Sequence, residues 1–255
     1  MICNEDKNSN EPKILLAIPI YNEERHIDAI LNEVSKYIDD VLVIDDGSTD
    51  GSKKILAQRE NICVISYPCN RGYGQTIINA FDFAIGSRYD WIITIDCDLQ
   101  HEPAQIPHFI DVIKKDHSDI IYGSDIISGS RYLESSPKSG DGPPEDRRKI
   151  NSEITRLVNE QLNLPITDAF CGFKAHRVKA VQKMQLGEVG YAVPLEFWVQ
   201  CAAMRLRVKE IPVSLIYNDP NRHFGGELDD PNTRLNHYLD VFEKTLIKAG
   251  LKKQA

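Results

Sequence analysis

The chain has 255 residues, of which 42% are hydrophobic and 27% are charged, and its formal net charge is −8. This size fits one large α/β domain or a domain with a small appendage, and the composition is that of a soluble globular protein with a sizeable core. The acidic balance argues against a general nucleic-acid binder, which needs a basic surface. We expect no signal peptide, because no basic segment followed by an apolar one opens the chain. We also expect no membrane span, because no apolar stretch reaches the ~20 residues that a spanning helix needs.

The cysteines include no Cys-x-x-Cys pair, the spacing typical of zinc ligands and redox motifs. We therefore predict reduced thiols in a cytoplasmic protein, without a disulfide framework or a structural zinc site. The cysteines lie at positions 3, 63, 69, 97, 171 and 201.

Apolar runs alternate with amphipathic stretches over residues 13–125. The runs have the length and branched composition of buried strands, whereas the stretches between them repeat apolar residues every three or four positions, as helices do. This alternation predicts an α/β domain with a mainly parallel, doubly wound sheet flanked by helices. Strands are expected at 13–19, 41–46, 62–67, 91–96 and 119–123, and helices at 27–34, 77–85 and 104–114.

The second half of the chain has a different character. Residues 134–146 are rich in Pro, Gly, Ser and charged residues, which is typical of a long mobile loop, and we expect them to form a lid. A second polar loop is expected at 218–232. Helices are predicted at 150–158, 192–206 and 235–246, and a β segment at 207–217.

Residues 91–101 form the most informative segment of the chain. An apolar run ends abruptly in Asp96 and Asp98, with Cys97 between them. In a strand, residues two apart face the same side, so both carboxylates would face one ligand, while Cys97 would point into the packing of the sheet. Two such carboxylates repel each other unless a cation lies between them, and Gln100 would add a third oxygen. Ligands of open α/β sheets bind at the carboxyl ends of strands, so the segment predicts a divalent metal that carries a nucleotide diphosphate.

Four polar loops would meet at one edge of a parallel sheet. Each has an ordinary alternative reading: Asn22 could cap a helix, the acidic loop after the second strand could be a simple turn, and Arg71 could lie in an unremarkable glycine loop. Their convergence favours a nucleotide pocket. The loops are residues 19–24, 45–50, 70–74 and 96–100.

Five motifs occur in order: Pro-Ile-Tyr-Asn-Glu-Glu, Val-Ile-Asp-Asp-Gly-Ser-Thr-Asp-Gly-Ser, Asn-Arg-Gly-Tyr-Gly, Asp-Cys-Asp-Leu-Gln-His and Gly-Ser-Arg-Tyr. Together they resemble the motifs of family 2 glycosyltransferases with the GT-A fold, over residues 13–225. Within that family the chain is most similar to the polyprenyl-phosphate sugar transferases, of the dolichol-phosphate mannose synthase type. The resemblance implies a nucleotide-sugar donor such as GDP-mannose or UDP-glucose, a Mg²⁺ or Mn²⁺ ion, inversion at the anomeric carbon, and a polyprenyl phosphate or another glycan as acceptor.

The resemblance also implies roles for individual residues. Arg131 would hold a phosphate bidentately, with a surface salt bridge as the alternative. Asp168 would act as a general base or orient the acceptor; a phosphate acceptor is already anionic and needs no base. With Asp98, these two form the implied catalytic set. The implied metal ligands are Asp96, Asp98 and Gln100, and the tentative acceptor-phosphate ligands are Arg131, Arg148 and Arg222. The implied nucleotide-sugar pocket comprises Pro19, Tyr21, Glu23, Asp46, Arg71, Gly74, Asp96, Cys97 and Asp98.

The implied domain organisation is a flexible N-terminus, 1–12, followed by a single domain at 13–255. Its nucleotide-sugar half would be 13–125, and its acceptor half, 126–255, would end in an amphipathic helix. Lysines on that helix could contact an anionic membrane surface or form an ordinary solvated face. Glu196, on a mostly apolar helix, would either pair internally with Arg205 or Arg207 or take part in catalysis.

Two departures and two alternatives stay open. Where the family follows its late arginine with Gly-x-Ser-Lys, Arg222 is followed by His-Phe-Gly-Gly-Glu-Leu-Asp-Asp, which is acidic. The membrane spans that some relatives carry at the C-terminus are also missing. A nucleotidyltransferase is disfavoured, because that class opens with a basic glycine loop where this chain has Tyr-Asn-Glu-Glu. A non-catalytic nucleotide-binding or scaffold protein on the same fold is the other alternative.

Overall fold

The computed structural model describes residues 11–118, 123–139, 142–217 and 226–253. Seven strands form one sheet in the order β3-β2-β1-β4-β7-β5-β8. Each strand runs parallel to the others except β7, which pairs antiparallel with β4 and with β5. The prediction of a mainly parallel, doubly wound sheet is therefore confirmed. The strands are β1 (Ile14–Ile20), β2 (Val41–Asp45), β3 (Cys63–Ser66), β4 (Trp91–Thr94), β5 (Ile126–Ser130), β7 (Lys174–Arg177) and β8 (Val208–Pro212).

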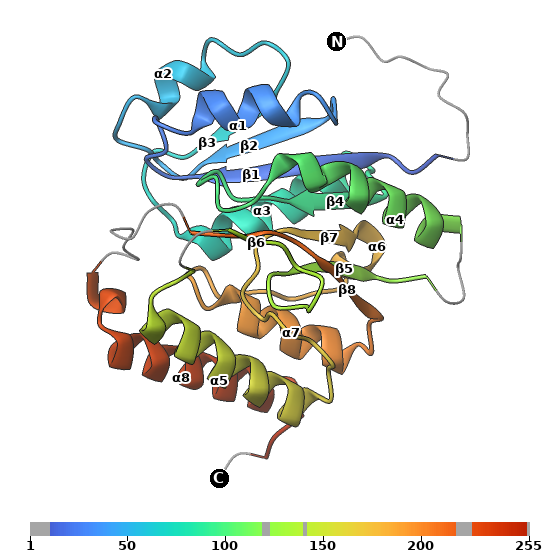
Figure 1. Cartoon of the computed structure of the whole chain (residues 1–255), viewed down its shortest axis with the longest axis vertical. Helices are drawn as coiled ribbons and strands as arrows, with labels where there is room; N and C mark the ends of the chain where they lie inside the picture. The colour runs from blue at the N-terminus through green and yellow to red at the C-terminus, as the bar shows by residue number, and fades with distance from the viewer. Residues whose placement is uncertain (1–10, 119–122, 140–141, 218–225, 254–255) are drawn as a thin grey trace.

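Helices cover both faces of the sheet (Figure 1). Alternate residues of β1 face opposite sides, as the pleat requires: Leu16 and Ile18 pack with α1, α2 and α4, whereas Leu15 and Ala17 pack with α3 and α6. A third apolar cluster, centred on Trp198, joins α5, α7 and α8 at the opposite end of the molecule from α1 and α2. The helices are α1 (Ile27–Val34), α2 (Ser52–Leu56), α3 (Tyr73–Gly86), α4 (Ile106–Ser118), α5 (Glu145–Leu162), α6 (Val178–Val181), α7 (Val193–Ala203) and α8 (Pro231–Lys248).

One strand prediction needs correction, one stays a prediction, and two strands were not predicted. The strand expected at 91–96 ends at Thr94, so Asp96 lies in the following loop and not in the strand. The strand expected at 119–123 falls mostly on residues 119–122, which lie outside the described residues, and it stays a prediction. The sheet also contains β5, at Ile126–Ser130. The antiparallel strand β7 was not predicted, because Lys-Ala-His-Arg is short and polar although its first three residues are buried.

The predicted lid, 134–146, is wrong as a single loop. Its middle forms β6 (Lys138–Ser139), which pairs in parallel with β9 (Leu215–Ile216), and its last two residues form the first turn of α5. The β segment expected at 207–217 is likewise divided between β8 and β9, which belong to different sheets.

The polar loop expected at 218–232 lies partly outside the described residues, at 218–225. A 3₁₀ turn, Gly226–Asp229, follows, and α8 begins at Pro231, with Asp230 accepting a hydrogen bond from Thr233 N at 2.7 Å. Such a cap satisfies one of the amide groups that a helix start leaves unpaired. Residues 1–10 of the expected flexible N-terminus also lie outside the described residues. Within the described ranges, no helix is both long enough and apolar enough to cross a membrane.

Candidate active site

The parallel strands bring six polar segments to one edge of the sheet. The loops that follow β1, β2, β3, β4 and β5 meet there, and so does the segment that enters the antiparallel β7. They surround a cavity of about 820 Å³. Of the predicted site residues, those that line the cavity are Pro19, Tyr21, Glu23, Asp46, Asp96, Cys97, Asp98, Gln100 and Arg131. Those that lie outside its lining are Arg71, Gly74, Arg148 and Asp168.

Asn22 fastens the loop after β1 to the loop after β2. Its side-chain oxygen accepts hydrogen bonds from Thr49 N at 2.7 Å and Asp50 N at 3.3 Å. Its backbone N–H donates a hydrogen bond to Ser48 Oγ at 2.9 Å. Its backbone has φ = 57°, a left-handed conformation that asparagine tolerates better than most residues. Asn22 does not cap α1, because that helix begins only at Ile27. The two loops therefore form one rigid wall of the cavity.

Asp46 holds the backbone of the third loop. Its two carboxylate oxygens accept hydrogen bonds from Arg71 N at 2.8 Å and Gly72 N at 2.9 Å, and the residue is 3% exposed. These bonds occupy both oxygens of the Asp46 carboxylate, which was expected to belong to the nucleotide-sugar pocket. The Arg71 guanidinium stacks over the Tyr67 ring, 4.5 Å from its centroid, outside the cavity lining. Asp46 and Arg71 thus build the wall of the pocket.

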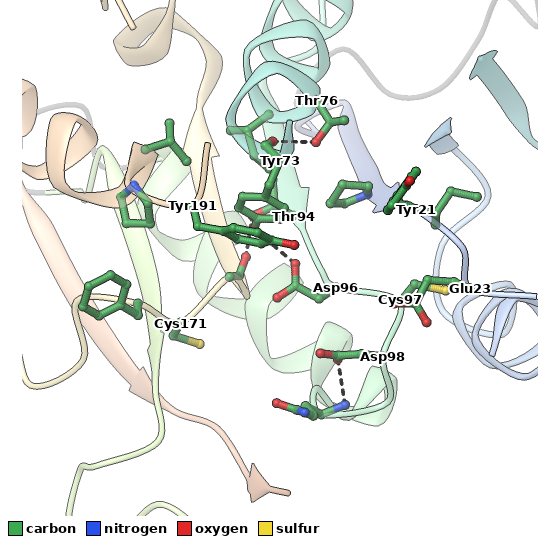
Figure 2. Close-up of a pocket in the computed structure, with 18 of the residues that line it drawn as sticks. Tyr21, Glu23, Tyr73, Thr76, Thr94, Asp96, Cys97, Asp98, Cys171 and Tyr191 are labelled. Atoms are coloured by element: carbon green, nitrogen blue, oxygen red, sulfur yellow. Dashed lines mark hydrogen bonds between the residues drawn. The ribbon is translucent and has the colours of Figure 1, made fainter. Parts of the chain in front are cut away.

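Asp96 and Asp98 lie on a turn at the floor of the cavity. Asp98 Oδ1 accepts a hydrogen bond from Gln100 N at 3.0 Å, and Leu99 between them has φ = 59°. Both carboxylates point into the pocket in Figure 2, although the turn rather than strand pleating orients them. Cys97 is buried in the apolar core beside the sheet, as predicted.

A tyrosine and a glycine fix the Asp96 side chain. The Tyr73 hydroxyl donates a hydrogen bond to Asp96 Oδ1 at 3.1 Å (Figure 2). Burial of this hydroxyl and the nearby negative charges of Asp96 and Asp98 raise the pKa of Tyr73 well above its ordinary value, so it stays a donor. A side chain at Gly172 would clash with Asp96 Oδ2. Glycine at this position therefore leaves room for the Asp96 carboxylate in its present orientation.

The oxygen donors at this floor suit a hard divalent cation. Asp96, Asp98 and Gln100 supply two carboxylates and an amide, and the Gln100 Nε2 atom is buried with no hydrogen-bond partner among the described residues. Within the same residues no cluster of three or more His, Cys, Asp or Glu side chains could hold a metal alone. Mg²⁺ is commonly held by one or two carboxylates together with substrate phosphates, and this donor set fits that pattern.

Arg131 and Asp168 form a buried, bidentate ion pair on the far side of the cavity. Arg131 Nε and Nη2 donate to Asp168 Oδ2 and Oδ1 at 2.7 and 2.9 Å, and Arg131 N and Phe170 N donate to the same carboxylate at 3.2 Å each. Burial alone would raise the pKa of Asp168, but the Arg131 guanidinium outweighs it and holds that pKa below its ordinary value. A carboxylate with four donors and a lowered pKa is a weak base. The salt bridge that was the alternative for Arg131 is therefore present, but it is buried and not on the surface, because the Asp168 side chain is fully buried.

Lys174 adds a second cation beside this pair and was not singled out from the sequence. Its ammonium group donates to the Cys171 carbonyl oxygen and lies 5.4 Å from the centre of the Trp198 ring. Burial lowers the pKa of Lys174, and burial with the adjacent Lys174 charge lowers the pKa of His176 to about 3, so His176 is neutral. The sequence carried a signal for Lys174, because this lysine directly follows the aromatic and glycine-containing segment 170–173, close to the predicted site residue Asp168.

On α5, Arg147 rather than Arg148 faces the cavity. Arg147 lines it, with its guanidinium 5.8 Å from the centre of the Tyr217 ring, whereas Arg148 is exposed on another face of the helix. Consecutive helix residues point about 100° apart, so only one of the two can face a given site. Arg222, the remaining predicted phosphate ligand, lies outside the described residues.

Glu196 pairs with neither Arg205 nor Arg207, contrary to one expectation. Its Oε2 accepts hydrogen bonds from Gly187 N and Glu188 N at 2.7 Å each, and its Oε1 lies 3.6 Å from Lys248 Nζ. Arg207 instead forms a two-pronged pair with Asp125 at 3.0 Å.

Comparison with known proteins identifies the family. The model of glycosyl transferase family 2 matches residues 16–184, well over half of the chain. The chain belongs to glycosyl transferase family 2. Among its relatives is the undecaprenyl-phosphate mannosyltransferase of Micrococcus luteus, which is 24% identical over 80% of this chain and 84% of that protein. The dolichol-phosphate mannosyltransferase of Pyrococcus furiosus is 28% identical over 78% of this chain, which spans 55% of that longer protein.

The fold agrees with this assignment. The structure of glucosyl-3-phosphoglycerate synthase from Mycobacterium tuberculosis, solved with uridine diphosphate, covers 95% of this chain with a TM-score of 0.67 and 17% sequence identity. The match spans 82% of that chain, and at this identity it shows the fold alone. The GT-A fold and the glycosyltransferase class predicted from the motifs are therefore confirmed.

Proposed function

We propose that this family 2 glycosyltransferase transfers a hexose, with inversion and with the help of Mg²⁺ or Mn²⁺, from a nucleoside-diphosphate sugar to a polyprenyl phosphate. The observation that carries the proposal is that one cavity is lined both by the acidic residues Asp96 and Asp98 and by the cationic residues Arg131, Arg147 and Lys174. The names of the two relatives given above include undecaprenyl phosphate and dolichol phosphate, and this supports a polyprenyl phosphate as the acceptor.

The donor would bind along the edge formed by the first four strands. Pro19, Tyr21 and Glu23 would contact the base and ribose, while Asp46 would keep the neighbouring loop in shape through its two backbone hydrogen bonds. Asp98 and Gln100 would hold the metal ion against the diphosphate, while Asp96 would approach the ion and contact the sugar. When bound, the ion would neutralise the charge that develops on the departing diphosphate.

The acceptor would bind against the cationic wall. Its phosphate is already anionic, so it needs no general base, and the weakly basic Asp168 is better suited to hold the Arg131 fork in position. Arg131, Arg147 and Lys174 would attract the acceptor phosphate and align one oxygen with the anomeric carbon of the donor. That oxygen forms the new bond to carbon as the bond to the diphosphate breaks on the opposite face, which inverts the configuration and releases the nucleoside diphosphate.

Membrane contact through α8 has less support. On this helix Lys244 pairs with Asp240 at 2.7 Å, and Lys248 lies 3.6 Å from Glu196. Lys252, which follows the helix, pairs with Glu243 at 2.6 Å. These contacts favour the solvated helix face over an anionic-lipid surface. A lipid acceptor would then have to reach the cavity from the membrane by another face, and we propose a cytoplasmic protein that meets the membrane only peripherally.

Thermal denaturation with GDP, UDP, GDP-mannose and UDP-glucose, each with Mn²⁺ or with EDTA, tests the donor site. A ligand at 100 times its dissociation constant stabilises a protein by about 2.7 kcal/mol, which is readily seen as a shift. We expect one nucleotide to raise the melting temperature only with Mn²⁺, and its sugar to be transferred to a short-chain polyprenyl phosphate. Nucleotide binding without transfer or hydrolysis would favour the scaffold alternative, and no shift with any nucleotide would overturn the proposal.

A further inference from the structure

The loop at residues 187–191, which precedes α7, rests on the start of α3. Val189 O accepts a hydrogen bond from Gln75 N at 3.2 Å. Side chains at Gly72 or Gly74 would clash with the backbone of this loop, so the two segments pack backbone to backbone. Gly72 has φ = 100°, which only glycine adopts readily. The 187–191 loop is thus fitted closely to the helix that carries Tyr73.

Glu196 holds this loop in place through hydrogen bonds to its backbone. Its carboxylate is 3% exposed and accepts the Gly187 and Glu188 amides at 2.7 Å each, short distances typical of charge-assisted bonds. Acidic residues are rarely buried to this degree without partners, and here the principal partners are backbone amides. The carboxylate therefore determines where the 187–191 loop lies.

The loop in turn contacts the acidic floor of the cavity through two aromatic rings. Tyr191 stacks on Tyr73, with ring centroids 6.0 Å apart and planes 14° apart, and the Tyr73 hydroxyl donates to Asp96 Oδ1. Figure 2 shows Tyr191 and Tyr73 together beside Asp96. Tyr191 is 40% exposed, so its ring is held by this stacking and not by deep burial.

We infer that Glu196 is a positioning residue for the sugar end of the donor site. It fixes the 187–191 loop, the loop places Tyr191 against Tyr73, and Tyr73 orients the Asp96 carboxylate. The inference rests on the proposed function, in which Asp96 contacts the donor's sugar. The base and ribose end has its own support, because Asp46 holds the Arg71 and Gly72 amides independently. Loss of Glu196 should therefore affect the nucleotide sugar more than the nucleoside diphosphate.

The first test compares Glu196→Ala with Glu196→Gln by calorimetric titration with Mn²⁺ and GDP, UDP, GDP-mannose or UDP-glucose. We expect Glu196→Ala to bind the nucleotide sugar about tenfold more weakly, the effect of losing roughly one ordinary hydrogen bond, while the affinity for the nucleoside diphosphate stays unchanged. Glu196→Gln should stay within about threefold of the wild type, because one side-chain oxygen accepts both amides and is retained. Lys248→Ala, which removes only the exposed partner at 3.6 Å, is the matched control and should behave as the wild type.

A second variant guards against misfolding of Glu196→Ala. Tyr191→Ala cuts the same chain of contacts at an exposed ring, and it should reproduce the selective loss of nucleotide-sugar affinity with the melting temperature preserved. In a Tyr73→Phe background, which already lacks the hydrogen bond to Asp96, Glu196→Ala should add less than about threefold. The inference would be overturned if the effects of Glu196→Ala and Tyr73→Phe on nucleotide-sugar affinity were fully additive. It would also be overturned if Glu196→Gln bound the nucleotide sugar as weakly as Glu196→Ala does. Absence of nucleotide-sugar binding in the wild type would instead overturn the proposed function.

Discussion

Replacement of Asp168 by Asn distinguishes an orienting carboxylate from a general base. Asparagine keeps the shape of the side chain and one acceptor oxygen, so the bonds from Arg131 Nη2 and Phe170 N can persist. The two bonds to Oδ2, from Arg131 N and Arg131 Nε, are lost, because an amide N–H now faces two donors. Arg131 would then keep its charge in a largely buried position without a counter-ion.

The expected loss of stability follows from these contacts. Breaking a buried ion pair by removing one partner costs about 3–5 kcal/mol, which agrees with losing two bonds that involve a charged group. For a chain of this size each kcal/mol shifts the melting temperature by about 2–4 °C, so Asp168→Asn should melt about 10 °C below the wild type. The control is Glu160→Gln, which breaks the Arg156–Glu160 pair, with side chains 59% and 52% exposed; this should cost less than about 0.5 kcal/mol.

Thermal denaturation by circular dichroism, with a transfer assay on the same samples, measures both consequences. An orienting carboxylate requires that stability and acceptor affinity fall together. An Asp168→Asn protein that melts with the wild type but transfers no sugar at any pH would refute this reasoning and restore the general-base role.

Three further predictions concern the same cavity. The pKa of Asp168 is lower in the folded protein than in the unfolded chain. Its pair with Arg131 therefore stabilises the fold fully above the unfolded pKa of about 3.9, and this stabilisation is lost as the pH falls through the folded pKa. The melting temperature of Asp168→Asn should consequently fall less steeply below pH 4 than that of the wild type. Asp98→Ala should weaken Mn²⁺-dependent nucleotide binding about 100-fold or more, because loss of an outer-shell partner of a metal ligand alone costs about 10- to 100-fold in metal affinity. Nucleotide binding in EDTA should stay unchanged. Undiminished Mn²⁺-dependent affinity in titration would exclude Asp98 as a metal ligand. Gly172→Ala should displace the Asp96 carboxylate and weaken nucleotide-sugar binding at a cost of about 1–3 kcal/mol in stability, and an unchanged donor affinity would show that Asp96 needs no fixed position.

The part of the fold that could be predicted is the part in which local pattern and tertiary environment agree. The apolar runs of β1, β2 and β4 are buried on both faces, so their composition alone marks them as inner strands of a parallel sheet. The edge strand β3 was also predicted, although its residues are largely exposed, because its branched side chains still favour an extended chain.

The strand that was missed and the strand that was not located depend on contacts between distant segments. The Ile-Ile pair at 126–127 forms β5 because it finds partners in β7 and β8. β7 itself reads as polar, yet Lys174 is buried beside Trp198 and His176 packs between Phe81 and Phe197. Neither environment is visible from sequence neighbours.

The candidate site shows a similar division. Motif spacing located the edge of the sheet and the acidic floor, but it did not separate the residues that face a ligand from those that build the loops. The side-chain oxygens of Asn22, Asp46 and Glu196 all accept hydrogen bonds from backbone amides 8 to 28 residues away. Both carboxylate oxygens of Asp168 likewise accept hydrogen bonds from Arg131, 37 residues earlier in the chain. An acidic or amide side chain in a motif is equally well explained by a ligand and by a loop amide, because both offer the same donors.

This equivalence has a mechanistic consequence. Backbone amides held by buried carboxylates cannot reorganise when a charged substrate arrives, so the loops that surround the cavity are set before the donor binds. Among the residues described above, Tyr21, which is 44% exposed, then has the greatest freedom to respond. The buried acids supply a frame that different donors could share.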